Sequence, residues 1–242
     1  MAIALDDLAR FLDRLLAVER FGDDQGGIFR ASNRPVRRLG LTLEPWPGLA
    51  TWVERERLDA LFLHRPWRLP PDGPGDLGVL AHHLAFDERL TTGYNPRLAE
   101  VLGMTELEVL GRKEGRPLGM LGAVPDQEFA RFARVVTEVF GGNDAVHAGD
   151  QREIGRVAVV GAMTEALVRE AAARGVQVYV TGQWRQPATR AVEGIGIGVV
   201  AVGHRRAEEW GLRALAAILE ERWAGLVCRT PRLSRGVGDD LE

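Results

Sequence analysis

Three short motifs in this chain combine histidine with other polar side chains and could bind a divalent metal. The first is His64-Arg65-Pro66, the second places Asp87 four residues after His83, and the third places Glu208 four residues after His204. Imidazole nitrogen and carboxylate oxygen together form a ligand set that suits Zn, Fe, Mn, Ni or Co. The sequence therefore makes a metal site the leading candidate for chemistry.

Each motif has a plain structural alternative, because a histidine near a strand end is more often hydrogen-bonded structure than a metal ligand. Convergence of all three motifs would indicate a site, and spacing along the chain does not show convergence. The other two histidines are expected elsewhere. His82 should point away from its neighbour His83 on a strand, and His147, near a loop and close to Asp144 and Asp150, should belong to solvated structure.

Other kinds of catalytic chemistry find little support in the sequence. Cys228 is the single cysteine, so the chain can form no internal disulfide and no cysteine-based zinc site. No serine occupies a nucleophile-elbow pattern. The glycine run at 194–198 precedes a predicted strand, whereas a dinucleotide fingerprint follows a strand and opens a helix. Any metal must therefore be held by His, Asp and Glu.

The composition is that of a globular protein with enough apolar material for a core: 242 residues, 45% of them hydrophobic and 27% charged. The formal net charge of −3 gives no support for sequence-independent nucleic-acid binding, which usually requires a basic surface. The N-terminal segment lacks the apolar stretch of a signal peptide, and no segment approaches the roughly 20 apolar residues of a membrane span. We therefore expect a cytoplasmic protein with no membrane partner.

Apolar periodicity and capping residues predict an α/β fold, in which a mixed or mostly parallel sheet is covered by helices. Helices are expected at residues 1–20, 49–57, 95–102, 125–139, 164–174, 188–193 and 208–222. Strands are expected at residues 36–43, 60–63, 107–110, 118–124, 157–160, 176–181 and 197–202. Polar or Gly- and Pro-rich stretches predict loops at residues 21–35 and 70–75.

The predicted strands deliver two of the histidines to the carboxyl ends of strands, where ligands bind in open α/β sheets. His64 follows the strand expected at 60–63, and His204 follows the strand expected at 197–202. Glu208 lies on the same helical face as His204 if the turn is already wound at that histidine.

The three motifs, in this order and spacing, resemble the Nif-three-like family, whose members are also called GTP cyclohydrolase 1 type 2 homologues or dinuclear-metal-centre proteins. The family shows His-His-Pro after a strand where this chain has His64-Arg65-Pro66, and its His-x-x-x-Asp matches His83 to Asp87. A glycine and Asn-x-x-Leu-Ala follow in the family, and Gly93 and Asn95-Pro96-Arg97-Leu98-Ala99 follow here. The chain resembles a short form of the family.

The second half of the chain continues the resemblance, which covers about residues 24–220. Thr181-Gly182-Gln183 stands where the family shows Thr-Gly-Glu. Gly203-His204 and Glu208 match Gly-His-x-x-x-Glu, and Gly211-Leu212 matches a Gly-Leu beyond it. The matches include polar residues together with the glycine and turn residues around them, which makes the resemblance specific.

The resemblance implies a single Nif-three-like domain of two interlocked α/β lobes with mixed sheets, at about residues 1–122 and 123–242. It also implies a toroidal homohexamer, a trimer of dimers, with metal sites facing an internal cavity. By the family pattern Glu208 would bridge two metals, and His64 and His204 would complete one site with His83 close by. Asp87 and the second histidine of the family's pair would complete the other site.

The second family histidine is Arg65 in this chain, and a guanidinium cannot ligate a cation. One or two divalent ions per subunit are compatible with the resemblance, and the arginine favours one. We expect that ion at His64, His204 and Glu208, with Arg65 in the place of the other cation.

In that position Arg65 would pair with Asp87 or Glu208. Two alternatives stay open: the arginine points to solvent while a water or His83 fills the gap, or the site holds no metal. Gln183 replaces the glutamate of the family's Thr-Gly-Glu, which removes an acid from beside the site.

The leading functional interpretation is a metal-dependent hydrolase-type site for a small phosphorylated or nucleotide-like substrate, whose phosphoryl or carbonyl oxygen the metal would polarise. Asp87 or His83 would act as the base, and Arg65 could clamp an anionic group. The alternative is a non-catalytic, ring-shaped scaffold that holds nucleic acid or a partner protein and keeps a structural metal. Metal-dependent turnover that His204→Ala abolishes would favour the enzyme. Chelation that lowers thermal stability, without turnover of any substrate, would favour the scaffold.

Overall fold

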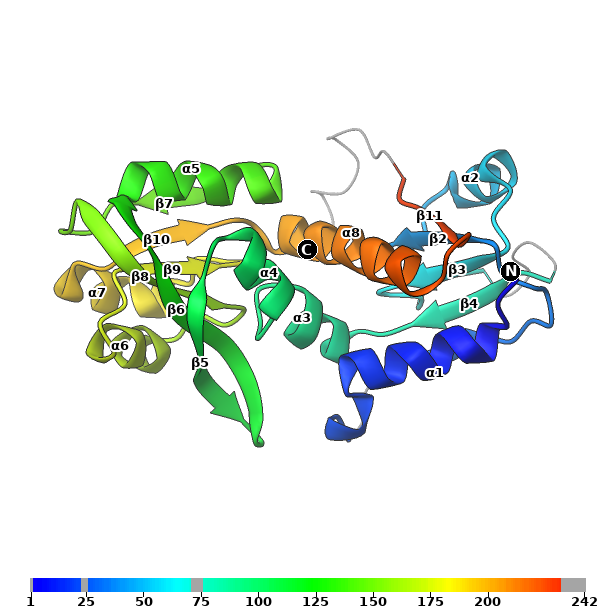
Figure 1. The fold of residues 1–242 in the computed structure, drawn as a ribbon, viewed down its shortest axis with the longest axis horizontal. Coiled ribbons are helices and arrows are strands. Elements are labelled where there is room, and N and C mark those ends of the chain that lie inside the picture. Colours follow the sequence, from blue (N-terminus) through cyan, green and yellow to red (C-terminus); the bar gives the residue numbers. More distant parts are fainter. Residues whose placement is uncertain (1, 23–25, 71–75, 232–242) are drawn as a thin grey trace. The chain divides into compact units, whose positions relative to one another are not determined.

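The structure is a computed structural model that describes residues 2–22, 26–70 and 76–231 (Figure 1). The helices in these ranges are α1 (Leu5–Leu16), α2 (Leu49–Glu56), α3 (Leu84–Leu90), α4 (Pro96–Val101), α5 (Phe129–Phe140), α6 (Glu165–Ala173), α7 (Gln186–Ile195) and α8 (His204–Arg222). The strands are β1 (Gly27–Arg30), β2 (Arg38–Thr42), β3 (Ala60–Leu63), β4 (Gly78–Ala81), β5 (Thr105–Lys113), β6 (Arg116–Glu128), β7 (Ala145–His147), β8 (Glu153–Val160), β9 (Val178–Thr181), β10 (Gly198–Ala201) and β11 (Val227–Arg229). A short 3-10 helix, Val18–Arg20, follows α1.

Contacts divide the chain into two compact units, which are described separately below. Unit 1 consists of Met1–Leu15, Gln25–His83 and Leu215–Glu242, and unit 2 consists of Leu16–Asp24 and Leu84–Ala214. Unit 1 is therefore assembled from three separate stretches of chain. The lobe boundary expected near residue 122 falls inside β6, within unit 2.

The sheet of unit 1 has the strand order β1-β4-β3-β2-β11. Neighbouring strands are parallel except β1, which is antiparallel to β4. Every residue of β3 and β4 is buried, as their short, continuous apolar sequences ALFL and GVLA indicate for inner parallel strands. The chain leaves the carboxyl end of the central strand β3 at His64, so the fold brings this histidine to the middle of a sheet edge.

Helix α2 packs on this sheet through Trp52 and Val53, which share a core cluster with Leu61 of β3 and Val79 of β4. Gly40 of β2 makes this close packing possible, because a Cβ there would lie 2.8 Å from the Trp52 ring. Helix α1 buries one of its own faces, formed by Leu5, Leu8, Leu12 and Leu16.

The sheet of unit 2 has the strand order β5-β6-β8-β9-β10-β7. β8, β9 and β10 are parallel, and the other neighbours are antiparallel. Val178 and Val180 of β9 join a cluster with α4, α5 and the first half of α8, whereas Tyr179 joins a cluster with α6 and α7. The sheet is therefore covered on both faces, and Figure 1 shows α6 and α7 on the opposite side from α5.

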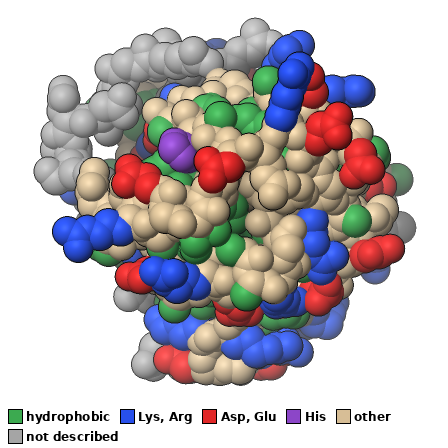
Figure 2. Space-filling view, turned by 90° about the vertical axis from the view of Figure 1, so that its left-hand side faces the viewer, with side chains coloured by type: hydrophobic (Ala, Val, Ile, Leu, Met, Phe, Trp, Pro, Cys, Tyr) green, Lys and Arg blue, Asp and Glu red, His purple; other side chains and the backbone are tan. Residues whose placement is uncertain are grey.

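Charges of both signs share the face of the molecule drawn in Figure 2. Lys and Arg side chains lie interspersed with Asp and Glu side chains there, and neither sign gathers into one continuous patch. This face agrees with the small formal net charge of −3.

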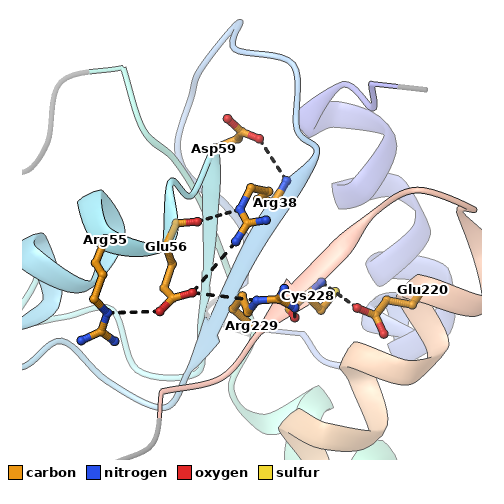
Figure 3. A network of polar contacts seen from close by, with 7 residues as sticks. All are labelled: Arg38, Arg55, Glu56, Asp59, Glu220, Cys228 and Arg229. Atoms are coloured by element: carbon orange, nitrogen blue, oxygen red, sulfur yellow. Dashed lines mark hydrogen bonds and ion pairs between the residues drawn. The ribbon is translucent and has the colours of Figure 1, made fainter.

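Polar contacts tie β11, an edge strand, to the elements around it in unit 1 (Figure 3). The backbone N–H of Cys228 donates to Glu220 Oε1 at 2.8 Å. Arg229 Nε lies 3.9 Å from Glu56 Oε2, and Arg38 Nε donates to the Glu56 carbonyl at 2.6 Å. The strand is thus linked both to the end of α8 and to the end of α2.

The structure confirms the expected α/β fold with mixed sheets covered by helices, and it corrects three boundaries. β1 lies inside the loop expected at 21–35. The helix expected from residue 125 begins at Phe129, because β6 continues to Glu128 and Pro125 sits at an irregularity in the strand register, where no ladder bond is needed. The last helix begins at His204, four residues before the expected start.

Five short elements of the described chain are absent from the elements expected from the sequence: α3, β1, β4, β7 and β11. The loop expected at residues 70–75 lies outside the described residues, except for residue 70. Among the described helices, none is both long and apolar enough to cross a membrane.

Candidate metal centre

In unit 1, His64 is fixed in a buried position by the sheet itself. The hydrogen-bond ladder continues past β3, since His64 N donates to the Thr42 carbonyl at 3.2 Å. The imidazole is 0% exposed, and its Nδ1 lies 2.9 Å from the His82 carbonyl oxygen. A carbonyl can only accept, so Nδ1 is the donor and Nε2 is the ring nitrogen left to bind a cation. A backbone carbonyl that fixes the tautomer in this way is typical of metal-ligating histidines.

His83 stands directly before α3, and its ring lies 4.8 Å from the His64 ring, centroid to centroid. Trp67 meets His83 edge to face at 5.2 Å. Its neighbour His82 has a different environment, because His82 stacks on Phe62 at 6.3 Å and is 0% exposed. The structure therefore brings His64 and His83 together in unit 1, and it places His82 in the core.

Arg65 follows the same strand and is engaged by a carboxylate that sequence reasoning did not identify. Arg65 Nε donates to Glu44 Oε2 at 3.1 Å. Glu44 stands two residues beyond the end of β2, the parallel neighbour of β3, so both side chains leave the same sheet edge. The strand order is the signal that could have found Glu44, and it requires knowing which strands are neighbours.

In unit 2, Asp87, His204 and Glu208 come together. Each offers a ligand atom, and these atoms all lie within 4.8 Å of one another. His204 Nε2 is 3.0 Å from Glu208 Oε1 across one turn of α8. Because α8 begins at His204, the turn between the two residues is fully wound. Two carboxylates and one imidazole form a donor set that fits a divalent cation, so these residues could hold a metal ion.

The turn from β10 into α8 determines the position of His204. Gly203 has φ +93°, which a residue with a side chain rarely adopts, and a Cβ there would lie 2.6 Å from Arg206 Nη1. Arg206 Nη1 also donates to the Val202 carbonyl at 3.2 Å. The loop after β9 is the neighbour of this turn, because a Cβ at Gly182 would lie 3.6 Å from His204 Cα. Gln183, next in that loop, is exposed.

Close packing of α3 against α8 brings Asp87 to the pair on α8. Gly211 lies at the crossing, where a Cβ would meet Phe86 Cζ at 2.9 Å and the Leu90 carbonyl oxygen at 3.0 Å. Any larger residue at Gly211 must push the two helices apart. The glycine of the Gly-Leu motif therefore has a direct role in holding the carboxylate of Asp87 near Glu208.

The segment after α3 is tied back onto the helix that carries Asp87. Thr91 Oγ1 donates to the Asp87 carbonyl at 2.7 Å. Gly93 allows the chain to fold tightly onto α3, since a Cβ there would lie 2.1 Å from the Glu88 carbonyl oxygen. Asn95 then caps α4, accepting from Leu98 N at 3.2 Å. The motif residues around Asp87 thus shape the turn between α3 and α4.

The fold and the site together define an α/β protein with a candidate His and carboxylate metal centre at the carboxyl ends of its strands. A family model described as Duf34/NIF3 (NGG1p interacting factor 3) matches residues 74–230. The chain therefore belongs to the DUF34/NIF3 family, which confirms the resemblance drawn from the motifs.

Individual relatives span nearly the whole chain. A GTP cyclohydrolase 1 type 2 homolog from Deinococcus radiodurans is 26% identical over 237 residues, which cover 91% of this chain and 90% of that protein. A protein of the same name from Pseudomonas aeruginosa is 28% identical and covers 93% of this chain and 95% of its own length. Reduced HcgD from Methanocaldococcus jannaschii is 19% identical, with a TM-score of 0.73 over 96% of this chain and 99% of that one, and shows the same fold.

Proposed function

We propose that this chain binds a divalent metal through Asp87, His204 and Glu208, with His64 and His83 as the other candidate ligands. The observation that carries the proposal is the cluster of ligand atoms of Asp87, His204 and Glu208 within 4.8 Å of one another. His83 stands four positions before Asp87 in the sequence, so even a fully extended chain spans at most about 14 Å between them.

The reaction we propose is hydrolysis of a small phosphorylated or nucleotide-like substrate. A bound divalent cation would supply Lewis-acid polarisation of a phosphoryl or carbonyl oxygen. Asp87 and His83 are the candidate bases, and Arg65, already oriented by Glu44, would hold an anionic group of the substrate. The relatives named GTP cyclohydrolase 1 type 2 homologs support the nucleotide-like class of substrate.

We further propose one ion per subunit. The family's second histidine is replaced by Arg65, whose guanidinium is a permanent cation and offers no lone pair. A cation fixed by Glu44 directly after His64 would repel a second metal and partly supply its charge.

The test is the metal content of the freshly purified protein, measured by inductively coupled plasma mass spectrometry for wild type and variants. We expect close to one equivalent in wild type, and loss of most of it in His204→Ala and Glu208→Gln. His147→Ala is the matched control, because His147 packs on Trp184 in unit 2 outside the cluster. Full metal content in both site variants would contradict the proposal. A screen for released phosphate and for opening of purine nucleotides, with His204→Ala as the blank, then tests the hydrolase.

The assembly remains a proposal from the family resemblance: a homohexamer built as a trimer of dimers. The scaffold alternative requires the same ring without turnover. Nucleic acid as its occupant gains no support from the interspersed charges of Figure 2. Native mass spectrometry gives the subunit number. A metal whose removal lowers the melting temperature of an inactive ring would favour the scaffold over the enzyme.

A further inference from the structure

Arg116, the first residue of β6, is a nearly buried cation with a full set of partners in unit 2. The residue is 8% exposed. Its guanidinium reaches Glu88 with two nitrogens, Nε to Oε2 at 3.0 Å and Nη2 to Oε1 at 3.4 Å. Nη1 donates to Glu114 Oε2 at 2.8 Å and to the Arg20 carbonyl at 3.2 Å. The Phe21 ring lies 4.6 Å from the guanidinium carbon.

The Arg116 guanidinium binds Glu88, the residue next to the candidate metal ligand Asp87. Glu88 follows Asp87 on α3, a short helix of seven residues. A two-point contact between a guanidinium and a carboxylate is planar and directional, so it restrains rotation as well as distance. α3 is thus held by Arg116 through Glu88, and by α8 through the close approach at Gly211.

We propose that Arg116 is a positioning residue for the metal centre, a role that rests on the proposed metal binding. It acts through Glu88 to hold α3 in the rotation that presents the Asp87 carboxylate to His204 and Glu208. Arg116 itself touches neither metal nor substrate. Its contribution is to the geometry of the ligand set, and residues that position ligands typically change metal affinity about 10–100-fold when altered.

Because Arg116 is positively charged, its positioning role can be distinguished from a purely electrostatic effect on the affinity for metal. Removing a positive charge near the site would, by electrostatics alone, strengthen the binding of a cation. Loss of positioning would weaken it. The direction of the change in metal affinity therefore distinguishes the two effects.

The experiment measures the affinity of the full-length, metal-stripped protein for Co²⁺ by titration calorimetry, together with the visible absorption spectrum of the Co²⁺ form. The variants are Arg116→Met, which removes both the charge and the two-point contact with Glu88, and Arg116→Lys, which keeps the charge but loses the two-point contact. The control is Arg174→Met, which also removes one arginine held by several acceptors. Arg174 pairs with Glu108 and Glu170, away from α3. All measurements are made well below the melting temperature of each variant.

We expect Arg116→Met to bind Co²⁺ about tenfold more weakly than wild type, with an altered absorption spectrum. Arg116→Lys should fall between the two, and Arg174→Met should match wild type. Unchanged or tighter binding by Arg116→Met with a wild-type spectrum would overturn the positioning role, even if its melting temperature falls. No Co²⁺ binding by wild type would instead refute the proposed metal centre, so the two failures are distinguishable.

Discussion

His204 Nε2 lies 3.0 Å from Glu208 Oε1, although the His204 side chain is 65% exposed and Glu208 is 1% exposed. One turn of α8 therefore joins an accessible imidazole to a buried carboxylate. Both residues lie on α8, so the helical backbone fixes their spacing at one turn. A spacing fixed by the helix reduces the reorganisation that metal binding requires.

Glu208→Gln should change stability in opposite directions with and without metal. In metal-free protein, the Glu208 carboxylate is buried close to that of Asp87, so a neutral amide relieves repulsion and should raise the free energy of unfolding by about 1 kcal/mol. With saturating Co²⁺ the same variant should unfold at a lower temperature than wild type, because it forfeits the stabilisation that bound metal supplies. Thermal unfolding with chelator and with Co²⁺ checks both signs. A shift of the same sign in both conditions would refute this account.

Arg65→His should restore the family's second histidine and raise the metal content from one equivalent towards two. The imidazole would offer a neutral donor where the guanidinium of Arg65 offers only positive charge. Metal analysis after saturation and gel filtration gives the stoichiometry. Arg68→His is the control, since it adds a histidine to the same loop at an exposed position. Equal stoichiometry in Arg65→His and wild type would show that Arg65 does not exclude a second ion.

Gly211→Ala should weaken metal binding and lower stability, although alanine is the better helix former. The added Cβ would lie 2.9 Å from Phe86 Cζ and 3.0 Å from the Leu90 carbonyl oxygen, so α3 and α8 must separate. Overpacking of this kind costs about 1–3 kcal/mol, which exceeds the gain of about 1 kcal/mol in helix propensity. Gly194→Ala in α7 is the matched control, because nothing lies within 4 Å of its added Cβ. Urea denaturation should show a gain for Gly194→Ala and a loss for Gly211→Ala.

Cys228 should make the stability of the protein fall at high pH. Burial raises the pKa of its thiol to about 12, helped by the nearby carboxylate of Glu220. The unfolded chain, with an ordinary thiol pKa of about 8.5, then releases its proton first. The contribution of the neutral thiol is complete below about pH 8.5 and is lost progressively as the pH rises towards 12. Urea midpoints between pH 7 and pH 10 should fall more for wild type than for Cys228→Ala, and equal slopes would contradict the assignment.

The inner strands were predictable from sequence because a strand buried on both faces of its sheet is a continuous run of apolar residues. β3 is a continuous apolar run, and β8 to β10 alternate with capped helices in the way that parallel sheets require. β7 and β11 have three residues each and lie at sheet edges. Their extended conformation comes from the strand they pair with, so the local sequence holds too little signal to reveal it.

Some residue pairs of the candidate site were likewise predictable from the sequence, and others were not. The spacing of His204 and Glu208 is one helical turn, so a local pattern was enough to pair them. Glu44 and Arg116 meet their partners 21 and 28 residues away along the chain. No periodicity links such pairs, and only the order of strands and the packing of α3 brings them together.

Unit 1 is built from three separate segments of the chain, so its parts become available in a fixed order during synthesis. β11, at residues 227–229, pairs with β2 at residues 38–40, so the last strand of that sheet leaves the ribosome long after the first. Most of unit 2 is one continuous stretch, Leu84–Ala214, which emerges whole before β11 is made. The nascent protein therefore carries an open edge on β2 until residues 227–229 have been translated, and chaperones that shield exposed strands have their longest opportunity there.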